Sequence, residues 1–274
     1  MKTVVVDKDD LKKIAPFFTS PQGEKILDYA IPLFAVDKVN ALYGRCCHEE
    51  GPKFAELLLK DLKIECVVNN PDMLEKLPSG PFITVSNHPF GGLDGIALLA
   101  LMGKIRPDYK IMVNSVLTYI QAMSTNFIAV EPYSSKKGSK TNLSGIKESI
   151  RHLREGHPIG FFPAGGVSKI QPNLRIEDNP WAPNIVRLIQ QIDVPVFPVY
   201  FHGHNSLMFN VMGLVSWKLR SLCLPREVFK ARGKTIRVSV GEPISPEEQR
   251  RFATPEELGK YLRAKTYEAG RRFR

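Results

Sequence analysis

The sequence lacks any uninterrupted apolar run of the roughly 18 to 20 residues that a membrane-spanning helix requires. Its first residues also lack the long apolar core and the small-residue cleavage site of a secretory signal peptide. We therefore expect a chain without a signal peptide or transmembrane span. If such a protein acts on lipids, it does so from the membrane surface.

Cysteine is scarce, and its spacing shows no pairing. The four cysteines are Cys46, Cys47, Cys66 and Cys223, and an adjacent pair is a poor disulfide or zinc signature. We expect reduced thiols. His202 and His204 flank Gly203, but no cysteine or carboxylate stands beside them at ligand spacing. The sequence therefore predicts no metal, and we expect these histidines at the rim of a site or bonded to backbone.

The sequence lacks the motifs of serine hydrolases and of common nucleic-acid-binding proteins, and its basic residues outnumber its acidic ones. The absence of a Gly-x-Ser-x-Gly elbow argues against a serine hydrolase. No recognition-helix or RNA-binding aromatic motif is present, so a basic nucleic-acid-binding protein remains an alternative supported by charge alone. There are 38 basic and 28 acidic side chains, a formal net charge of +10. Such a balance implies an anionic partner: nucleic acid, a membrane surface, or a substrate or carrier bearing phosphates.

The chain is long and apolar enough for a substantial core, with 274 residues of which 43% are hydrophobic. Residues 1–62 predict an N-terminal helical segment packed on the core, and residues 63–274 predict an α/β domain. In the second part short β-type runs alternate with helical stretches, which indicates a mostly parallel central sheet flanked by helices. Residues 134–140 predict a basic loop. The expected strands are 64–68, 82–85, 109–113, 127–130, 159–162, 196–201 and 235–240, and the expected helices are 24–30, 36–43, 52–62, 95–103, 116–123, 139–154, 183–192, 205–222 and 254–270.

The segment Ser86–Gly95 places a histidine and a carboxylate around a glycine-containing turn between a predicted strand and a predicted helix. His88 would follow the carboxyl end of the strand, where open α/β sheets bind their ligands. A neutral histidine can take the proton of an attacking hydroxyl, with Asp94 holding the other ring nitrogen. From spacing alone a second reading is equally open: Asp94 caps the following helix and His88 only bonds backbone in the turn.

Two further blocks follow predicted strands. Residues 160–169, Gly-Phe-Phe-Pro-Ala-Gly-Gly-Val-Ser-Lys, leave a strand into a proline- and glycine-containing turn. Residues 194–203, Val-Pro-Val-Phe-Pro-Val-Tyr-Phe-His-Gly, form a strand with two prolines. We expect these two strand ends and the His88 turn to converge on one site.

The order and spacing of the three blocks resemble the glycerolipid acyltransferase family, whose type member is 1-acylglycerol-3-phosphate acyltransferase. The resemblance covers about residues 64–245, with only a loose match at residues 126–130. The form His-Pro-Phe-Gly-Gly-Leu-Asp-Gly is most similar to the hemolysin-like branch, which includes bacterial O-acyltransferases that make ornithine and glycine lipids. It implies a peripheral enzyme at the cytoplasmic face of the inner membrane that transfers an acyl chain to the hydroxyl of a lyso-lipid.

The resemblance also implies roles for individual residues. His88 would be the general base and Asp94 its partner. No cofactor is implied, because acyl carrier protein or coenzyme A brings the acyl chain as a thioester. The implied substrate-binding residues are Asn87, Phe162, Pro163, Gly165, Gly166, Ser168 and Lys169.

Two departures from the family pattern stand out. Five residues rather than four separate His88 from Asp94, an insertion that a turn with two glycines accommodates. Ala164 and Val167 occupy positions where members with phosphate-bearing acceptors carry glutamate and arginine. Because an arginine fork is the natural clamp for a phosphate, we predict a lyso-amino-acid lipid as acceptor. Lysophosphatidic acid remains the alternative, since Lys169 offers a compensating charge.

The stretch 207–220 is unusually apolar and ends in Trp217, Lys218 and Arg220, a composition suited to a helix in a membrane interface. A buried core helix is equally compatible with this composition. Residues 217–240 contain seven basic side chains and one acidic one, which suits anionic lipid headgroups. The sequence predicts Trp217, Lys218 and Arg220 as membrane contacts, with a solvated basic face as the alternative.

Overall fold

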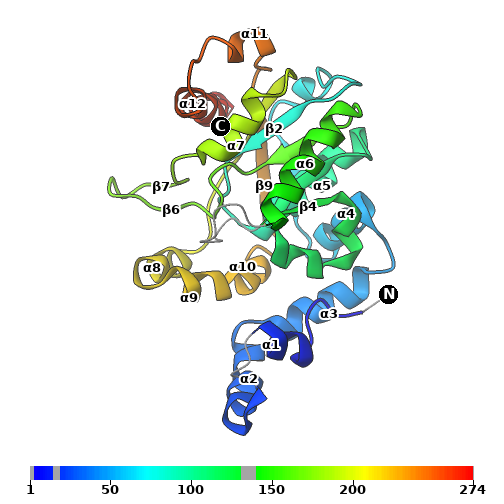
Figure 1. Ribbon diagram of the computed structural model, residues 1–274. Helices are drawn as coiled ribbons and strands as arrows, with labels where there is room; N and C mark the ends of the chain where they lie inside the picture. The colour runs from blue at the N-terminus through cyan, green and yellow to red at the C-terminus, as the bar shows by residue number, and fades with distance from the viewer. Residues whose placement is uncertain (1–2, 15–18, 131–139, 274) are drawn as a thin grey trace.

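The computed structural model describes residues 3–14, 19–130 and 140–273. Residues 134–139 of the predicted basic loop lie outside these ranges. The described chain forms one large sheet between two layers of helices, with a short hairpin beside it (Figure 1). The predicted fold class, an α/β structure with a mostly parallel sheet and an N-terminal helical layer, is confirmed.

The large sheet has seven strands in the order β1-β9-β8-β2-β5-β3-β4. From β8 to β4 all neighbouring strands are parallel, whereas β9 runs antiparallel to β8 and carries β1 parallel to itself. The pair β1 and β9 therefore runs opposite to the other five strands. The strands are β1 (Glu65–Val68), β2 (Ile83–Ser86), β3 (Lys110–Asn114), β4 (Phe127–Val130), β5 (Ile159–Phe161), β8 (Val196–Phe201) and β9 (Thr235–Val240).

Both faces of the sheet are covered, and the core lies on either side of it. Around β2, Phe82 packs with the buried residues of α4 (Gly51–Asp61) and α5 (Gly92–Ile105). Ile83 and Val85 point the other way and pack with α7 (Pro183–Gln190) and α12 (Pro255–Arg272). Because both faces are covered, the central strands β2, β5 and β8 are buried along almost their whole length. The helix α6 (Lys140–Arg154) lies against β4.

The N-terminal helices differ in how they meet this core. Leu42 and Tyr43 of α3 (Val36–Cys46) belong to the same buried cluster as α4. Of α2 (Pro21–Leu33), only Gly23 and Leu27 are buried. Figure 1 shows α1 (Lys8–Ile14) and α2 extending away from the sheet. The segment thus contacts the core through α3 and α4.

The predicted helix 205–222 is wrong as a single element. It is divided into α8 (Leu207–Val215) and α9 (Trp217–Leu222), because Ser216 has an extended backbone and its side chain caps α9 by accepting the Leu219 N–H at 3.5 Å. A third helix, α10 (Leu224–Lys230), follows directly. No described helix is long and apolar enough to span a membrane.

Other differences are local. The stretch predicted as helix at 116–123 forms two 3-10 turns, η3 (Ser115–Tyr119) and η4 (Gln121–Asn126). The sequence analysis missed a hairpin of β6 (Lys169–Ile170) and β7 (Ile176–Glu177). It also missed two short elements, η2 (Pro71–Leu74) and α11 (Pro246–Gln249).

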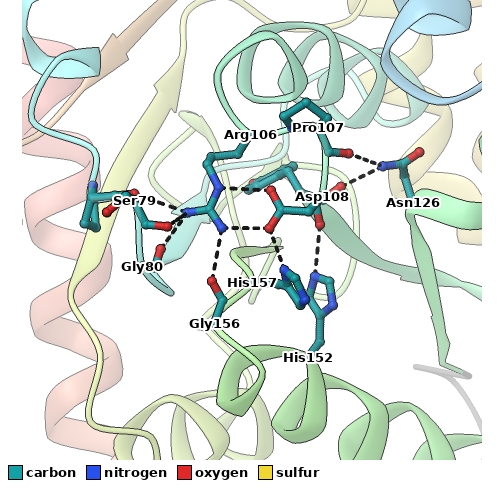
Figure 2. Close-up of polar contacts among 11 residues, drawn as sticks. Ser79, Gly80, Arg106, Pro107, Asp108, Asn126, His152, Gly156 and His157 are labelled. Atoms are coloured by element: carbon teal, nitrogen blue, oxygen red, sulfur yellow. Dashed lines mark hydrogen bonds and ion pairs between the residues drawn. The ribbon is translucent and has the colours of Figure 1, made fainter.

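A polar network ties the loops at the amino ends of the strands (Figure 2). The guanidinium of Arg106 makes two hydrogen bonds to the carboxylate of Asp108, at 2.9 and 2.7 Å. His157 Nδ1 lies 2.6 Å from the same carboxylate. Burial raises the pKa of Asp108, but the hydrogen bonds from Arg106 and His157 outweigh it and bring the pKa to about 2. Arg106 also donates to the main-chain carbonyls of Pro78, Ser79, Gly80 and Gly156.

Candidate active site

Three strand ends meet at one edge of the sheet. The central strand β2 lies between β5 and β8 and is parallel to both, so all three carboxyl ends point to the same edge. They carry the turn with His88, the turn 162–168 and the segment 202–205. The predicted convergence of these blocks is confirmed by the strand order.

Asp94 is wholly buried and faces His88. Its Oδ2 accepts the main-chain N–H groups of Phe90 at 2.8 Å and Gly91 at 2.9 Å, and lies 3.0 Å from Nδ1 of His88. The predicted N-cap position is wrong, because α5 begins at Gly92 and Asp94 is its third residue. The carboxylate still binds the N–H groups that precede the helix, so it fixes the turn and faces the imidazole at once. Gly91 enters the turn with φ of 77°, a conformation that favours glycine.

The contact between the imidazole and the carboxylate is close but loosely aligned. Nδ1 of His88 and Oδ1 of Asp94 are buried and make no hydrogen bond in the described structure. Catalytic hydrogen bonds in unliganded enzymes are often misaligned in this way and tighten when substrate binds. Burial raises the pKa of Asp94, against the opposing effect of His88 and the turn N–H groups. With Nδ1 directed at the carboxylate, Nε2 is the ring nitrogen left to act as a base.

The turn after β5 covers one face of His88. The ring of Phe162 lies 4.4 Å from the imidazole between centroids, tilted by 35°. The main-chain carbonyl of Phe162 accepts the N–H of Gly165, which has φ of 66°. Pro163 is buried and its carbonyl accepts the Ala182 N–H, Gly166 is half-buried, and Lys169 is exposed at the start of β6. The structure thus brings these residues to one turn with only Phe162 in ring contact with His88.

Two predicted substrate-binding residues form hydrogen bonds within the protein. Asn87 is buried, and its side chain donates to the Phe201 carbonyl at 2.9 Å and accepts the Phe201 N–H at 2.7 Å. Ser168 is buried and donates its hydroxyl to Asp178. These hydrogen bonds join the strand ends, and a substrate contact for either residue stays a prediction. Both residues hold the site together.

Asp178, which lies just after β7, is a site residue that the sequence does not predict. Its carboxylate accepts the main-chain N–H of His88 at 3.1 Å. No motif marks this position, because a hairpin separates Asp178 from the turn that it contacts. Only the folded hairpin brings it to His88.

The three predicted membrane contacts differ in their exposure. Arg220 is buried, with its guanidinium over the ring of Phe209 at 4.9 Å from the centroid, and it donates to the carbonyl of Val167. It therefore supports the turn after β5. Trp217 is 58% exposed and remains available as a surface contact. The side chain of Lys218 lies outside the described part of the structure.

The two histidines after β8 have separate partners. His202 Nε2 lies 2.7 Å from Oγ of Ser239, and His204 Nδ1 lies 2.8 Å from the main-chain carbonyl of Asn205. Within the residues that the structure describes, no group of three or more histidine, cysteine, aspartate or glutamate side chains is placed to hold a metal ion.

Comparison with known proteins gives concordant matches. A family model described as "Acyltransferase" matches residues 44–271, which contain all three strand ends. Two proteins named lyso-glycine lipid O-acyltransferase, from Phocaeicola vulgatus and Bacteroides thetaiotaomicron, are each 26% identical to this chain over 250 residues. These alignments cover 88% of this chain and 86% and 89% of the two relatives.

The fold is also similar to that of a solved structure. The crystal structure of the 1-acyl-sn-glycerophosphate (LPA) acyltransferase PlsC from Thermotoga maritima matches with a TM-score of 0.51 and 18% sequence identity. The match covers 94% of this chain and 91% of that one. The resemblance seen in the sequence is thus confirmed. Because the family match spans most of the residues and all three strand ends, the chain belongs to the acyltransferase family and is an acyltransferase.

Proposed function

We propose that this protein is a peripheral-membrane O-acyltransferase that moves a fatty acyl chain from a thioester donor to the hydroxyl of a lyso-lipid. The donor is acyl carrier protein or coenzyme A, and the acceptor is a lyso-amino-acid lipid. The observation that carries the proposal is the imidazole of His88, whose side chain is 19% exposed, beside the wholly buried carboxylate of Asp94. Such a pair suits proton transfer from a hydroxyl that attacks an acyl group.

The reaction needs one base, which takes a proton from the acceptor and later gives it to the leaving group. Nε2 of His88 takes the acceptor's hydroxyl proton as the oxygen attacks the thioester carbonyl. The carbon–oxygen bond forms, the carbon–sulfur bond breaks, and the leaving thiolate receives the proton from the imidazolium. Asp94 stabilises the positive charge on the ring between these two steps. No enzyme nucleophile is required, because the acceptor supplies its own.

The choice of acceptor rests on the turn after β5. The side chain of Val167 lies close to Gly91 and to the side chain of Leu224, in apolar surroundings. Ala164 likewise packs against the buried apolar cluster under β5. Neither side chain can bind a phosphate in the way that an arginine fork does. The names of the two lyso-glycine lipid O-acyltransferases point to the same class of acceptor.

A competition between acceptors tests this proposal. Purified protein is given a radiolabelled acyl thioester with either a lyso-glycine lipid or lysophosphatidic acid in mixed micelles. We expect the kcat/KM for the lyso-glycine lipid to exceed that for lysophosphatidic acid by at least about tenfold, the value of one charged hydrogen bond. Equal or greater use of lysophosphatidic acid would contradict the amino-acid acceptor. Parallel reactions with acyl carrier protein and coenzyme A thioesters identify the donor.

The proposed membrane contact is an exposed apolar surface on two short helices. We call it the α8–α9 face, and its exposed members are Leu207, Met208, Val211, Leu214, Val215, Trp217, Leu219 and Leu222. Leu174 in the connection between β6 and β7 is 83% exposed, and β6 packs against α8. An apolar patch of this extent is typical of a binding surface.

The location of the face supports this role. Arg220 joins α9 to the turn after β5, and Leu224 of α10 lies beside Gly91, so these helices adjoin the His88 edge. The exposed residues Arg232 and Lys234 precede β9, whose antiparallel pairing with β8 places its start at that same edge. Positive charge next to an apolar face favours anionic lipid.

Acidic substitution of the α8–α9 face is expected to weaken membrane binding. Leu214 and Val215 are 66% and 80% exposed, so replacing both with aspartate should leave the fold intact. We expect at least about tenfold weaker binding to vesicles of phosphatidylglycerol and phosphatidylcholine, because each lost side chain contributes about 1.5 kcal/mol on burial. Vesicle co-sedimentation measures the change. Leu143→Asp, at a 50% exposed apolar residue of α6, is the matched control, and equal losses in both proteins would contradict the assignment.

A further inference from the structure

Asp178 is a buried carboxylate to which the proposed reaction assigns no role, and its side chain is directed at the active-site turn. The residue is 1% exposed. Oδ1 accepts the main-chain N–H of His88 at 3.1 Å and the hydroxyl of Ser168, and Oδ2 accepts Nε1 of Trp181 at 3.3 Å. All three partners donate to the carboxylate, which is the arrangement that suits its ionised form.

These contacts form a closed network of hydrogen bonds among His88, Ser168 and Asp178. The N–H of Ser168 donates to the main-chain carbonyl of His88 at 2.8 Å, while the Ser168 hydroxyl and the His88 N–H both reach Asp178. Both polar main-chain atoms of His88 are therefore held from the turn after β5 and from Asp178. Because the main chain sets the direction of the Cα–Cβ bond, this hydrogen-bond network restricts the directions in which the imidazole can point.

Asp178 is itself anchored from the opposite side. Its N–H donates to Oη of Tyr267 at 2.9 Å, and its carbonyl accepts from Arg263 at 3.1 Å. Arg263 also forms an ion pair with Glu177 at 3.1 Å. Tyr267 and Arg263 belong to α12, which packs against β8 and β2. The position of the carboxylate is thus set by the helix layer and not by His88 alone.

We propose that Asp178 is a positioning residue of the acyl transfer, holding the main chain of His88 and keeping a second buried carboxylate next to this residue. The inference rests on the proposed function of His88. Burial raises the pKa of Asp178, while the bonds from Ser168 and from the His88 main chain oppose this effect. Two buried carboxylates are thus near His88: Asp94 on α5 lies 3.0 Å from Nδ1, and Asp178 accepts the main-chain N–H and interacts electrostatically with the side chain. A negative charge on either one favours the imidazolium that forms during transfer.

Several charged or titratable groups surround this carboxylate and must be considered in any test of pH dependence. His88 faces Asp178 from the turn after β2, and Arg263 and Tyr267 face it from α12. Glu177 precedes it in the chain but is paired with Arg263. Glu177→Gln is a matched control, since it removes a charge one residue away, keeps a side-chain oxygen that can accept from Arg263, and leaves the bond from Arg263 to the Asp178 carbonyl and every bond to His88 in place.

The test compares Asp178→Asn with Glu177→Gln and the parent enzyme. We expect Asp178→Asn to lower kcat roughly tenfold, the cost of a hydrogen bond to a charged group, with a much smaller change in KM. Loss of a negative charge disfavours the imidazolium, so the acid limb of the kcat/KM profile should move to lower pH. Glu177→Gln should keep the parent kcat and profile. A folded Asp178→Asn protein with parent kcat and acid limb would overturn the proposal.

A second measurement and a second variant separate this inference from the proposed function. Nuclear magnetic resonance follows the ring protons of His88 through a pH titration without substrate, and the midpoint should fall in Asp178→Asn. If the parent transfers no acyl chain, the proposed function fails, while an unmoved midpoint overturns the role of Asp178. Should Asp178→Asn not fold, Ser168→Ala keeps the charge and loses one bond. We expect Ser168→Ala to lower kcat several-fold and to leave the acid limb of the kcat/KM profile at the same pH. A kcat equal to that of the parent enzyme would overturn the proposal.

Discussion

Replacing His88 with alanine is expected to lower kcat for acyl transfer by about 10²- to 10⁴-fold, the usual contribution of a general base. The substitution removes the ring that faces Asp94 and stacks on Phe162, while the main-chain bonds of residue 88 to Ser168 and Asp178 do not depend on the side chain. The turn should therefore keep its shape, and KM for the acceptor should change much less than kcat. Initial rates with a labelled thioester at saturating acceptor measure both constants.

Two comparisons make this result specific. His48 is exposed between α3 and α4, so His48→Ala should transfer acyl chains at the parent rate. The double variant His88→Ala with Asp94→Asn should be no slower than His88→Ala alone, because the asparagine oxygen can still accept the N–H groups of the turn and the ring on which the charge acts is already missing. Near-parent turnover by a folded His88→Ala protein would show that another group takes the proton.

Replacing Arg106 with alanine is expected to lower the free energy of unfolding by about 3 kcal/mol, because it removes the charged partner of a partly buried carboxylate and leaves it only the contact with His157. Asp108 would lose two hydrogen bonds from the guanidinium, and the carbonyls of Ser79, Gly80 and Gly156 would lose their donor (Figure 2). Urea unfolding at pH 7, followed by circular dichroism, measures the loss. The effect should concern stability only, because Arg106 lies at the opposite edge of the sheet from His88.

An exposed arginine provides the control for this experiment. Arg250 pairs with Asp193 and Glu247, and its side chain is 55% exposed. Exposed pairs of this kind contribute about 0 to 1 kcal/mol, so Arg250→Ala should unfold close to the parent. Similar losses for the two variants would mean that the network in Figure 2 does not stabilise the amino edge. A fall in kcat at temperatures where Arg106→Ala is fully folded would contradict its purely structural role.

Hydrophobic patterns within a few residues predicted the strands and helices well where the structure does not divide an element in two. The strand predicted at 127–130 coincides with β4, and that at 235–240 with β9, because short β-branched runs bounded by turns leave little choice. The helix predicted at 205–222 failed at Ser216. A serine can either lie within one continuous helix or cap the start of a new one. In the structure Ser216 caps α9, and the hydrogen bond from Arg220 to the Val167 carbonyl favours the divided form.

The candidate site divides in a similar way. Residue type and spacing pointed to His88 and Asp94 and the family resemblance to Phe162, and the structure brings these three side chains together. The family resemblance assigns Asn87 and Ser168 to the substrate, and in sequence a polar side chain at a strand end looks the same whether it binds a substrate or bonds within the protein. Asp178 was missed because the residue that it holds is 90 positions away.

The sequence by itself determined the alternation of strands and helices, the histidine and carboxylate of the turn after β2, and the resemblance to the acyltransferase family. These features depend on side-chain type and on spacing within a few residues. The tertiary structure alone decided the strand order that sets β5 and β8 on either side of β2, and hence which polar groups meet. It also decided that the bonds of Asn87 and Ser168 are spent inside the protein, because a buried polar group must find its partner and only the fold brings that partner near.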